Sequence, residues 1–215
     1  MIKIGIIRVL TTADDQLLNA HGRLIEKCFP QFETISRCIP DQPEGIHDDS
    51  TREIAVPKVV RLGGQMASEG MKALIISCAD DPGLEELRGI VRIPVIGAGS
   101  AAAALALSLG KRIGVLTITE KTPEVVRQTL GGSFLTGVKP KGVSTTLDLL
   151  DKENRAHLVS SASELKRRGA DVILLCCTGY ATIGMAQELR ATLGIPVVDP
   201  VLAAAAATWY AVTVC

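Results

Sequence analysis

The chain is poor in aromatic side chains and carries no excess of charge. Aromatic residues make up 3% of its 215 residues, and 23 basic residues balance 23 acidic ones. Binding to nucleic acid needs cationic side chains for the phosphates and rings on which bases stack, so no nucleic acid partner is expected. No apolar run is long and plain enough to span a bilayer, and the first residues, MIKIGIIRVL, form a strand pattern instead of a signal peptide. These absences predict a cytoplasmic protein without a membrane partner.

The cysteines and histidines lack the spacing of a metal site. The six cysteines include no C-x-x-C pair, and His21, His47 and His157 stand alone. Zinc sites usually combine such pairs with further cysteine or histidine ligands. A disulfide framework is also not expected in a reducing cytoplasm. The sequence therefore predicts free thiols and no metal, and the polar helical surroundings of His21 and His157 predict solvated side chains.

What the chain does contain is an internal duplication. GMKALIISCADD, residues 70–81, aligns without a gap with GADVILLCCTGY, residues 169–180, so that Cys78 matches Cys177. Downstream of each cysteine, IPVIGAGSAAAALA matches IPVVDPVLAAAAAT. A repeat of this length predicts two similar units that pack against each other.

Short apolar runs alternate with helical segments along the chain. Strands are predicted at residues 2–9, 73–77, 112–117 and 172–176, with a further strand around Gly142–Thr145. Strands that are apolar throughout and separated by helices are typical of parallel sheets covered on both faces. We therefore predict an α/β fold of two pseudo-symmetric parallel-sheet domains with the active site in the cleft between them.

The two I-P-V segments set the predicted domain boundaries. Each is followed by a turn and an alanine-rich helix, so the chain is expected to cross between domains near Gly97 and to return near Asp199. The first domain would comprise residues 1–97 and 200–215, and the second residues 98–199. The small alanine side chains would let the two helices pack on each other at the interface.

Cys78 and Cys177 each follow an apolar strand and precede a turn and a helix. Open α/β sheets bind ligands at these strand ends. Backbone N–H groups at a helix start favour a thiolate and bind substrate oxygens. Because free cysteines are among the most buried residues, core packing is the alternative interpretation. Two cysteines at equivalent positions of a duplication favour a catalytic pair facing each other across the cleft.

At these residues the chain resembles the aspartate/glutamate/hydantoin racemase superfamily. S-C-A-D-D-P-G-L, residues 77–84, is similar to its first-cysteine motif, and C-C-T-G-Y, residues 176–180, to its second. The D-P-G-L ending and the Thr-Gly pair favour the hydantoin racemase branch. Two departures predict a differently lined pocket. Cys176 replaces the glycine usual before the second cysteine, and residues 8–12 replace an Asn-Pro-Asn motif.

The resemblance implies a cofactor-independent racemase or epimerase. One cysteine, as thiolate, removes the proton from a carbon next to a carbonyl, while the other donates a proton to the opposite face. Backbone N–H groups after each cysteine would hold the enolate oxygen. No pyridoxal phosphate, metal or nicotinamide is required, and the substrate is a hydantoin, allantoin or an amino-acid-like molecule. A homo-oligomer is expected.

Further site residues are predicted from their places beside the cysteines and at the strand ends. Ala79, Asp80, Thr178 and Gly179 follow the cysteines, Arg8 and Thr117 end the matching strands, and by resemblance Gly45 and Ile46 lie in a loop that covers the pocket. Structural alternatives stay open for several of them. Arg8 equally fits an ion pair, Thr117 the completion of a strand, and capping of the following helix is the default role of Asp80 and Asp81.

One motif competes with this interpretation. VIGAGSAAAA contains G-x-G-x-x-A between a strand and a helix, and Glu120 follows at about the distance of a ribose-binding acid. The second copy carries Asp199 and Pro200 in the equivalent turn, so the architecture accommodates this turn without glycines. We interpret the glycines as serving a tight turn and close helix packing.

Two other functions remain open. A binding module that kept the two-domain cleft without turnover would share the fold. A decarboxylase of the same superfamily would typically keep only the second cysteine, so the presence of both Cys78 and Cys177 favours isomerisation.

Overall fold

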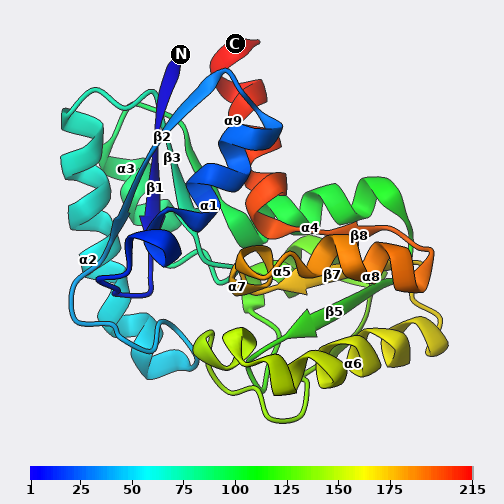
Figure 1. Ribbon diagram of the computed structural model, residues 1–215. Helices are drawn as coiled ribbons and strands as arrows, with labels where there is room; N and C mark the ends of the chain where they lie inside the picture. The colour runs from blue at the N-terminus through cyan, green and yellow to red at the C-terminus, as the bar shows by residue number, and fades with distance from the viewer. Residues whose placement is uncertain (215) are drawn as a thin grey trace.

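The computed structural model describes residues 1–214, and within them the strands form two four-stranded parallel sheets (Figure 1). The first sheet has the order β2-β1-β3-β4 and the second the order β6-β5-β7-β8, so one topology occurs twice. Cys215, which the sequence predicts to be dispensable for turnover, lies outside the described residues. The predicted α/β architecture of two duplicated parallel-sheet units is confirmed.

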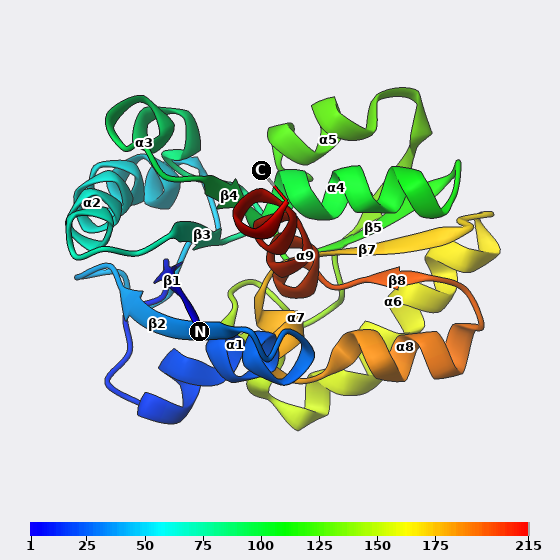
Figure 2. The ribbon, with the colours of Figure 1, turned by 90° about the horizontal axis from the view of Figure 1, so that it is seen from above.

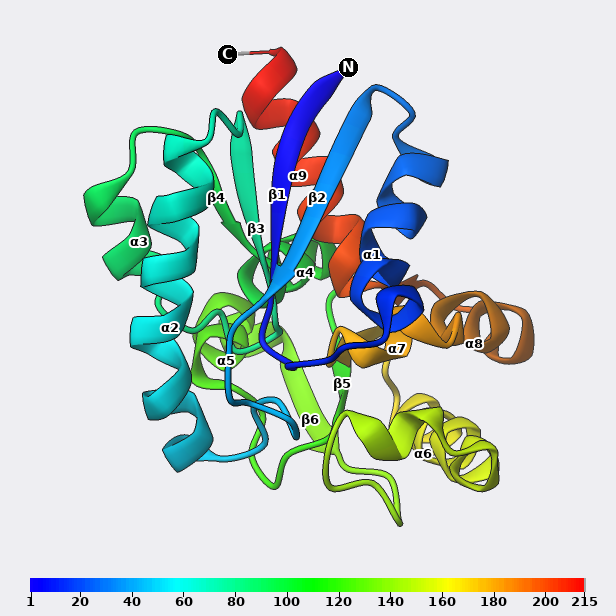
Figure 3. The same ribbon diagram turned by 60° about the vertical axis from the view of Figure 1, so that its left-hand side comes forward.

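The first unit is built on four parallel strands that lie side by side in Figure 3. They are β1 (Ile2–Arg8), β2 (Phe32–Cys38), β3 (Ala73–Ser77) and β4 (Val95–Gly97), and its helices are α1 (Asp15–Cys28), α2 (Asp49–Ser68) and α3 (Leu84–Ile90). Every residue of β3 is buried, as its unbroken apolar run predicts. The N-cap of α2 is Asp48, whose side chain and backbone form a reciprocal capping box with Thr51.

The second unit repeats this plan. Its strands are β5 (Ile113–Thr117), β6 (Phe134–Val138), β7 (Val172–Cys176) and β8 (Val197–Val198), with helices α5 (Glu124–Leu130), α6 (Arg155–Arg167), α7 (Gly179–Thr182) and α8 (Met185–Leu193) and the 3-10 turns η1 (Gly131–Ser133), η2 (Leu147–Leu150) and η3 (Lys152–Asn154). All residues of β5 and β7 are buried. The cores of both units therefore sit on the two faces of their sheets.

The strand predicted around Gly142–Thr145 is wrong. This segment is a loop, and the edge strand β6 lies earlier in the chain. Gly142 has a positive φ of 79°, and the backbone N–H groups of Ser144 and Thr145 donate to the Asp148 carboxylate at 2.7 and 2.8 Å. These N–H groups are thus satisfied locally and are not available to a neighbouring strand.

Two alanine-rich helices join the units. α4 (Ala98–Leu109) and α9 (Pro200–Thr213) pack on each other, and α9 also lies against β3, β4 and α1 of the first unit although the chain reaches it from β8 (Figure 2). Ala102, Ala106 and Ala203 belong to one buried cluster, where small side chains permit a close approach. The division at 97/98 and 199/200 stays a prediction with which these contacts agree. No helix within residues 1–214 has the length and apolar character needed to cross a membrane.

Candidate active site

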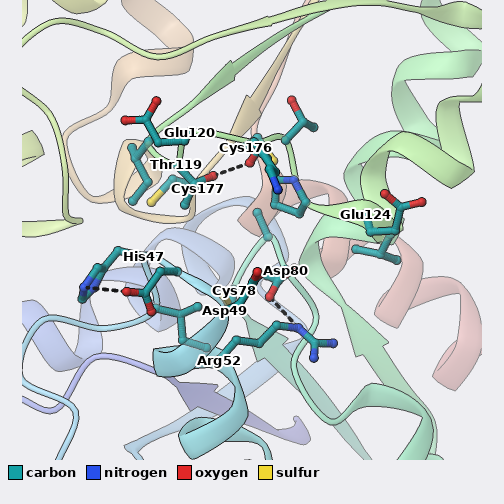
Figure 4. A pocket seen from close by; sticks show the side chains of 18 of the residues that line it. His47, Asp49, Arg52, Cys78, Asp80, Thr119, Glu120, Glu124, Cys176 and Cys177 are labelled. Carbon is teal, nitrogen blue, oxygen red and sulfur yellow. Dashed lines mark hydrogen bonds and ion pairs between the residues drawn. The ribbon is translucent and has the colours of Figure 1, made fainter.

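The two sequence-matched cysteines stand at equivalent points of the two sheets. Cys78 follows β3 and Cys177 follows β7, each by one residue. Their side chains are 8% and 6% exposed. Both line a cavity of about 670 Å³ whose walls come from both units, with Cys78 on the first-unit side and Cys177 on the second-unit side in Figure 4. The topology therefore brings two thiols to one cavity from opposite units.

Hydrogen bonds tie the two cysteine-bearing turns together across the units. The Thr178 hydroxyl donates to the Ser77 carbonyl at 3.0 Å. His21 bridges the same two turns, with Nδ1 2.8 Å from the Ser77 hydroxyl and Nε2 2.9 Å from the Thr182 hydroxyl. Because these buried bonds connect the residue before Cys78 with residues after Cys177, they hold the two thiols in a fixed relative position.

The sequence-based expectation of a solvated His21 is wrong. Its side chain is fully buried between the units. His21 stands four residues before the buried Ile25, so both lie on the inner face of α1. The helical period therefore indicated a buried His21, although its polar neighbours in the sequence suggested an exposed one. Burial, with the nearby charge of Arg8, lowers the pKa of His21 well below its ordinary value.

This burial predicts a pH-dependent stability. In the unfolded chain His21 titrates near pH 6.5, so below that pH the unfolded state binds a proton that the folded state does not. Stability is therefore lost as the pH falls. When the pH is lowered from about 7.5 to about 5.5, the unfolding free energy measured by urea denaturation should fall in both the wild type and His21→Gln. The fall should be about 1.4 kcal/mol greater in the wild type. Other titrating groups contribute equally in the wild type and in His21→Gln. An equal change of unfolding free energy with pH in the two proteins would contradict the burial of a neutral His21.

Hydrogen bonds and a nearby positive charge partly offset the effect of burial on Cys177. Burial raises the pKa of the Cys177 thiol, but hydrogen bonds from Thr146 and Gly179 and the charge of Arg8 act in the opposite direction. The Thr146 hydroxyl lies 3.5 Å from the sulfur and the Gly179 N–H nitrogen 3.4 Å from it. Arg8 itself is buried and donates to the Leu17 and Leu18 carbonyls, with no carboxylate partner within the described residues.

The surroundings of Cys78 favour its neutral thiol. Burial and the negative charge of Asp80 raise the pKa of Cys78 well above its ordinary value. Burial also raises the pKa of Asp80, to about 6, although its Oδ2 lies 2.7 Å from the Arg52 Nε. The two thiols are therefore electrostatically unequal, with Cys177 the easier to ionise.

Asp81 caps a different helix from the one expected. It adopts a left-handed φ of 48° and accepts hydrogen bonds from the N–H groups of Gly99 and Ser100, at 2.7 and 2.8 Å. It thereby caps α4, whereas the N-cap of α3 is Gly83, which supplies no side-chain cap. In the second unit, Asp199 caps α9 with its own carboxylate. Each copy thus places one aspartate at the start of its alanine-rich helix.

The glycines of the G-x-G-x-x-A motif are explained by close packing. A Cβ atom on Gly97 would lie 2.2 Å from the Asp81 Oδ2, and one on Gly99 would lie 2.0 Å from the Ala79 carbonyl oxygen. The first N–H groups of α4 already donate to Asp81, which occupies the place a phosphate would need. Glu120 pairs with Lys139 at 2.7 Å. The contacts favour the packing interpretation over the dinucleotide one.

The remaining predicted residues divide into two groups. Those that line the cavity with the two cysteines are Ile46, Ala79, Asp80 and Thr178. Those outside its lining are Arg8, Gly45, Thr117 and Gly179. Gly179 lies behind Cys177 and donates its N–H to the sulfur, Arg8 acts on Cys177 by charge, and Thr117 lines a smaller adjoining pocket.

Sequence reasoning missed several lining residues. Arg52 and Thr146 line the same cavity, and so do Lys121 and Arg127. Arg52 was indistinguishable from other polar positions of an amphipathic helix, and Thr146 lies in the loop mistaken for a strand. The repeat could not reveal them because they have no matched counterpart. Within residues 1–214, no group of three or more histidine, cysteine or acidic side chains is placed to hold a metal ion.

Comparison with known proteins places the chain among racemases. The family model Asp/Glu/Hydantoin racemase matches residues 4–208. Hydantoin racemase from Rhizobium meliloti is 27% identical over 170 residues, or 76% of this chain and 70% of that protein. Hydantoin racemase from Pseudomonas sp. strain NS671 is 30% identical over 168 residues, covering 75% of this chain and 66% of that protein. The structure of allantoin racemase from Klebsiella pneumoniae has a TM-score of 0.84 at 25% identity, covering 97% of this chain and 86% of that one.

Proposed function

Because the chain belongs to the Asp/Glu/hydantoin racemase family, we propose that it inverts a carbon next to a carbonyl by proton transfer between Cys78 and Cys177. Its classification as a racemase, an isomerase, is confirmed by the family match and by its hydantoin and allantoin racemase relatives. The observation that supports the two-thiol mechanism is that Cys78 and Cys177 line one cavity from opposite units. Inversion needs a base and an acid on opposite sides of one plane.

We propose resting roles for the two thiols from their unequal surroundings. The Cys177 thiolate removes the α-proton, so that the C–H bond breaks, an S–H bond forms and the electron pair moves into the carbonyl as an enolate. The Cys78 thiol then donates its proton to the opposite face of the same carbon. The product is the other enantiomer, and Cys78 is left as the thiolate. Reaction in the reverse direction restores the starting protonation states.

Backbone N–H groups are the proposed partners of the enolate oxygen. Ala79 and Thr178, the residues after the two cysteines, both line the cavity. Oriented N–H donors in a site of low dielectric stabilise a developing oxyanion without reorganisation. The N–H of Gly179 is already engaged by the Cys177 sulfur, so we assign this role to Ala79 and Thr178.

The substrate that fits this proposal is a hydantoin, allantoin or an amino-acid-like molecule. We further propose that the reaction needs no cofactor and that the protein acts in the cytoplasm as a homo-oligomer. Its relatives are named as hydantoin racemases and its structural neighbour as an allantoin racemase. The α-carbon of a hydantoin or allantoin ring lies next to one ring carbonyl, which takes up the electron pair as an enolate when the α-proton leaves, and this suits a pair of thiols without a cofactor.

The proposal predicts exchange of the α-proton with solvent. In heavy water, each enantiomer of allantoin and of 5-substituted hydantoins should lose optical rotation and gain α-deuterium faster with the protein than without it. Treatment with a chelator should leave the rate unchanged. Polarimetry and proton NMR measure the two processes, and protein-free samples correct for spontaneous exchange. Binding of these compounds without any exchange would favour the binding module instead.

A further inference from the structure

A second, smaller pocket opens off the cavity in the second unit. It has a volume of about 230 Å³ and shares Glu120, Lys121, Thr122 and Arg127 with the lining of the main cavity. Its other lining residues are Thr117, Phe134, Gly137 and Lys139. We call it the side pocket. It lies at the carboxyl ends of β5 and β6, where parallel sheets bind ligands.

Positive charge dominates the side pocket. Lys121, Arg127 and Lys139 line it, against the single carboxylate of Glu120. Glu120 lies 2.7 Å from the Lys139 nitrogen and so neutralises that one cation. Lys121 and Arg127 form no salt bridge within the described residues. The Arg127 guanidinium carbon lies 5.6 Å from the centre of the Phe134 ring, which restricts where the cation can go.

The shape of the side pocket also leaves room for a ligand group. Thr117 and Thr122 are buried at 2% and 9% exposure and line it as hydroxyl-bearing residues. Gly137 adds no side chain, and a Cβ atom there would lie 2.4 Å from the Thr122 hydroxyl. Since a water molecule takes up about 30 Å³ in the liquid, the volume admits a short substituent of several non-hydrogen atoms.

The opposite wall of the main cavity has the opposite charge. Asp48, Asp49 and Asp80 line it from the first unit; of these, Asp80 is paired with Arg52, and the Asp48 Oδ2 lies 3.8 Å from the His47 Nε2. An anionic substituent is repelled by this wall and attracted by the side pocket. A planar carboxylate also matches the fork of donors on a guanidinium. The charges therefore orient an anionic substrate in one sense within the cavity.

From these observations we infer that the side pocket binds a carboxylate carried on the side chain of the substrate. The inference rests on the proposed function. It predicts that the protein prefers 5-substituted hydantoins with an acidic side chain over those with a neutral one. Lys121 and Arg127 are the specificity-determining residues. The thiols act on the ring, while the substituent extends into the side pocket.

A matched pair of substrates tests the charge alone. Hydantoin-5-propionic acid and its amide have nearly the same size and differ in charge. The wild type should racemise the acid with a kcat/KM at least about tenfold above that of the amide, corresponding to one charge-assisted hydrogen bond. Arg127→Gln and Lys121→Gln should each lower kcat/KM for the acid about tenfold, mainly through KM, and change the amide less than about twofold.

Two further variants separate the role of the side pocket from general effects. Arg127→Lys keeps the charge and should retain most of the preference. Arg61→Gln removes one positive charge from an exposed position of α2 outside both pockets, and should leave the preference unchanged. An equal loss for acid and amide in Arg127→Gln, or the same loss in Arg61→Gln, would overturn the inference.

Calorimetry keeps the test independent of turnover. The wild type should bind the acid more tightly than the amide, and Arg127→Gln should abolish the difference. Equal affinities would refute the side-pocket assignment. If the amide is racemised normally and no preference exists, only this inference fails. If neither compound undergoes exchange but the acid still binds with the expected preference, the racemase proposal fails while the anion site stands.

Discussion

Replacement of either Cys78 or Cys177 by serine is expected to abolish racemisation, with kcat lowered by about 10³-fold or more. A hydroxyl is far too weak a base at neutral pH to remove an α-proton, and it is also a poorer acid than a thiol. Each replacement leaves one face of the substrate without its proton-transfer group. Loss of optical rotation by each purified enantiomer measures the effect.

Each single variant should nevertheless exchange the α-proton of one enantiomer. Abstraction and return of a proton by the surviving cysteine need no partner on the other face. Because Cys177 has Thr146, Gly179 and Arg8 to favour its thiolate, the Cys78→Ser variant should exchange faster than the Cys177→Ser variant. Proton NMR in heavy water, enantiomer by enantiomer, would detect this difference.

The other cysteines supply matched controls. Cys28 is exposed and Cys38 is half-buried, and neither lines the cavity, so their serine variants should retain nearly full turnover. Cys176 lies beside Cys177 and lines the cavity, so its replacement should have a modest packing effect. Full racemisation by Cys78→Ser or by Cys177→Ser would refute the two-base mechanism.

The duplication made the main features of the fold predictable. The segments around β3 and β7 are uninterrupted apolar runs, so their burial on both faces followed from composition, and their alignment paired Cys78 with Cys177. Because both copies end in the same turn and alanine-rich helix, the packing of α4 on α9 also followed. These features could be predicted because the two copies of the repeat can be compared with each other within one sequence.

Features that depend on contacts between the units were not predictable in this way. His21 sits on a helix with many polar neighbours, and only the fold brings Ser77 and Thr182 to its two nitrogens. The edge strand β6 was missed because its residues are only half-buried and include Gly137, which weakens the strand pattern. Asp81 was expected to cap the next helix, yet its left-handed backbone turns the carboxylate toward α4.

The second large effect is expected at Gly99, a glycine of the motif that resembles a dinucleotide fingerprint. In Gly99→Ala, the new Cβ atom would lie 2.0 Å from the Ala79 carbonyl oxygen and 2.7 Å from its carbon. Both are backbone atoms, so either α4 or the turn after Cys78 has to shift. We expect a loss of about 3 kcal/mol in unfolding free energy, typical of severe overpacking. A displacement of Cys78 by about 1 Å would lower kcat about 10²-fold.

Gly89→Ala is the matched control, because it makes the same substitution on a helix with open space around it. Gly89 lies in α3, and an added Cβ atom there meets no heavy atom within 4 Å. Alanine at this exposed helical position should be neutral or stabilising by up to about 1 kcal/mol. Urea denaturation and the α-proton exchange assay compare the two variants. If Gly99→Ala were tolerated as well as Gly89→Ala, close packing against Ala79 would not be the reason for the glycine. The glycines could then serve a dinucleotide site instead. Calorimetry with NAD and NADP would distinguish the two interpretations, because close packing requires that neither cofactor binds.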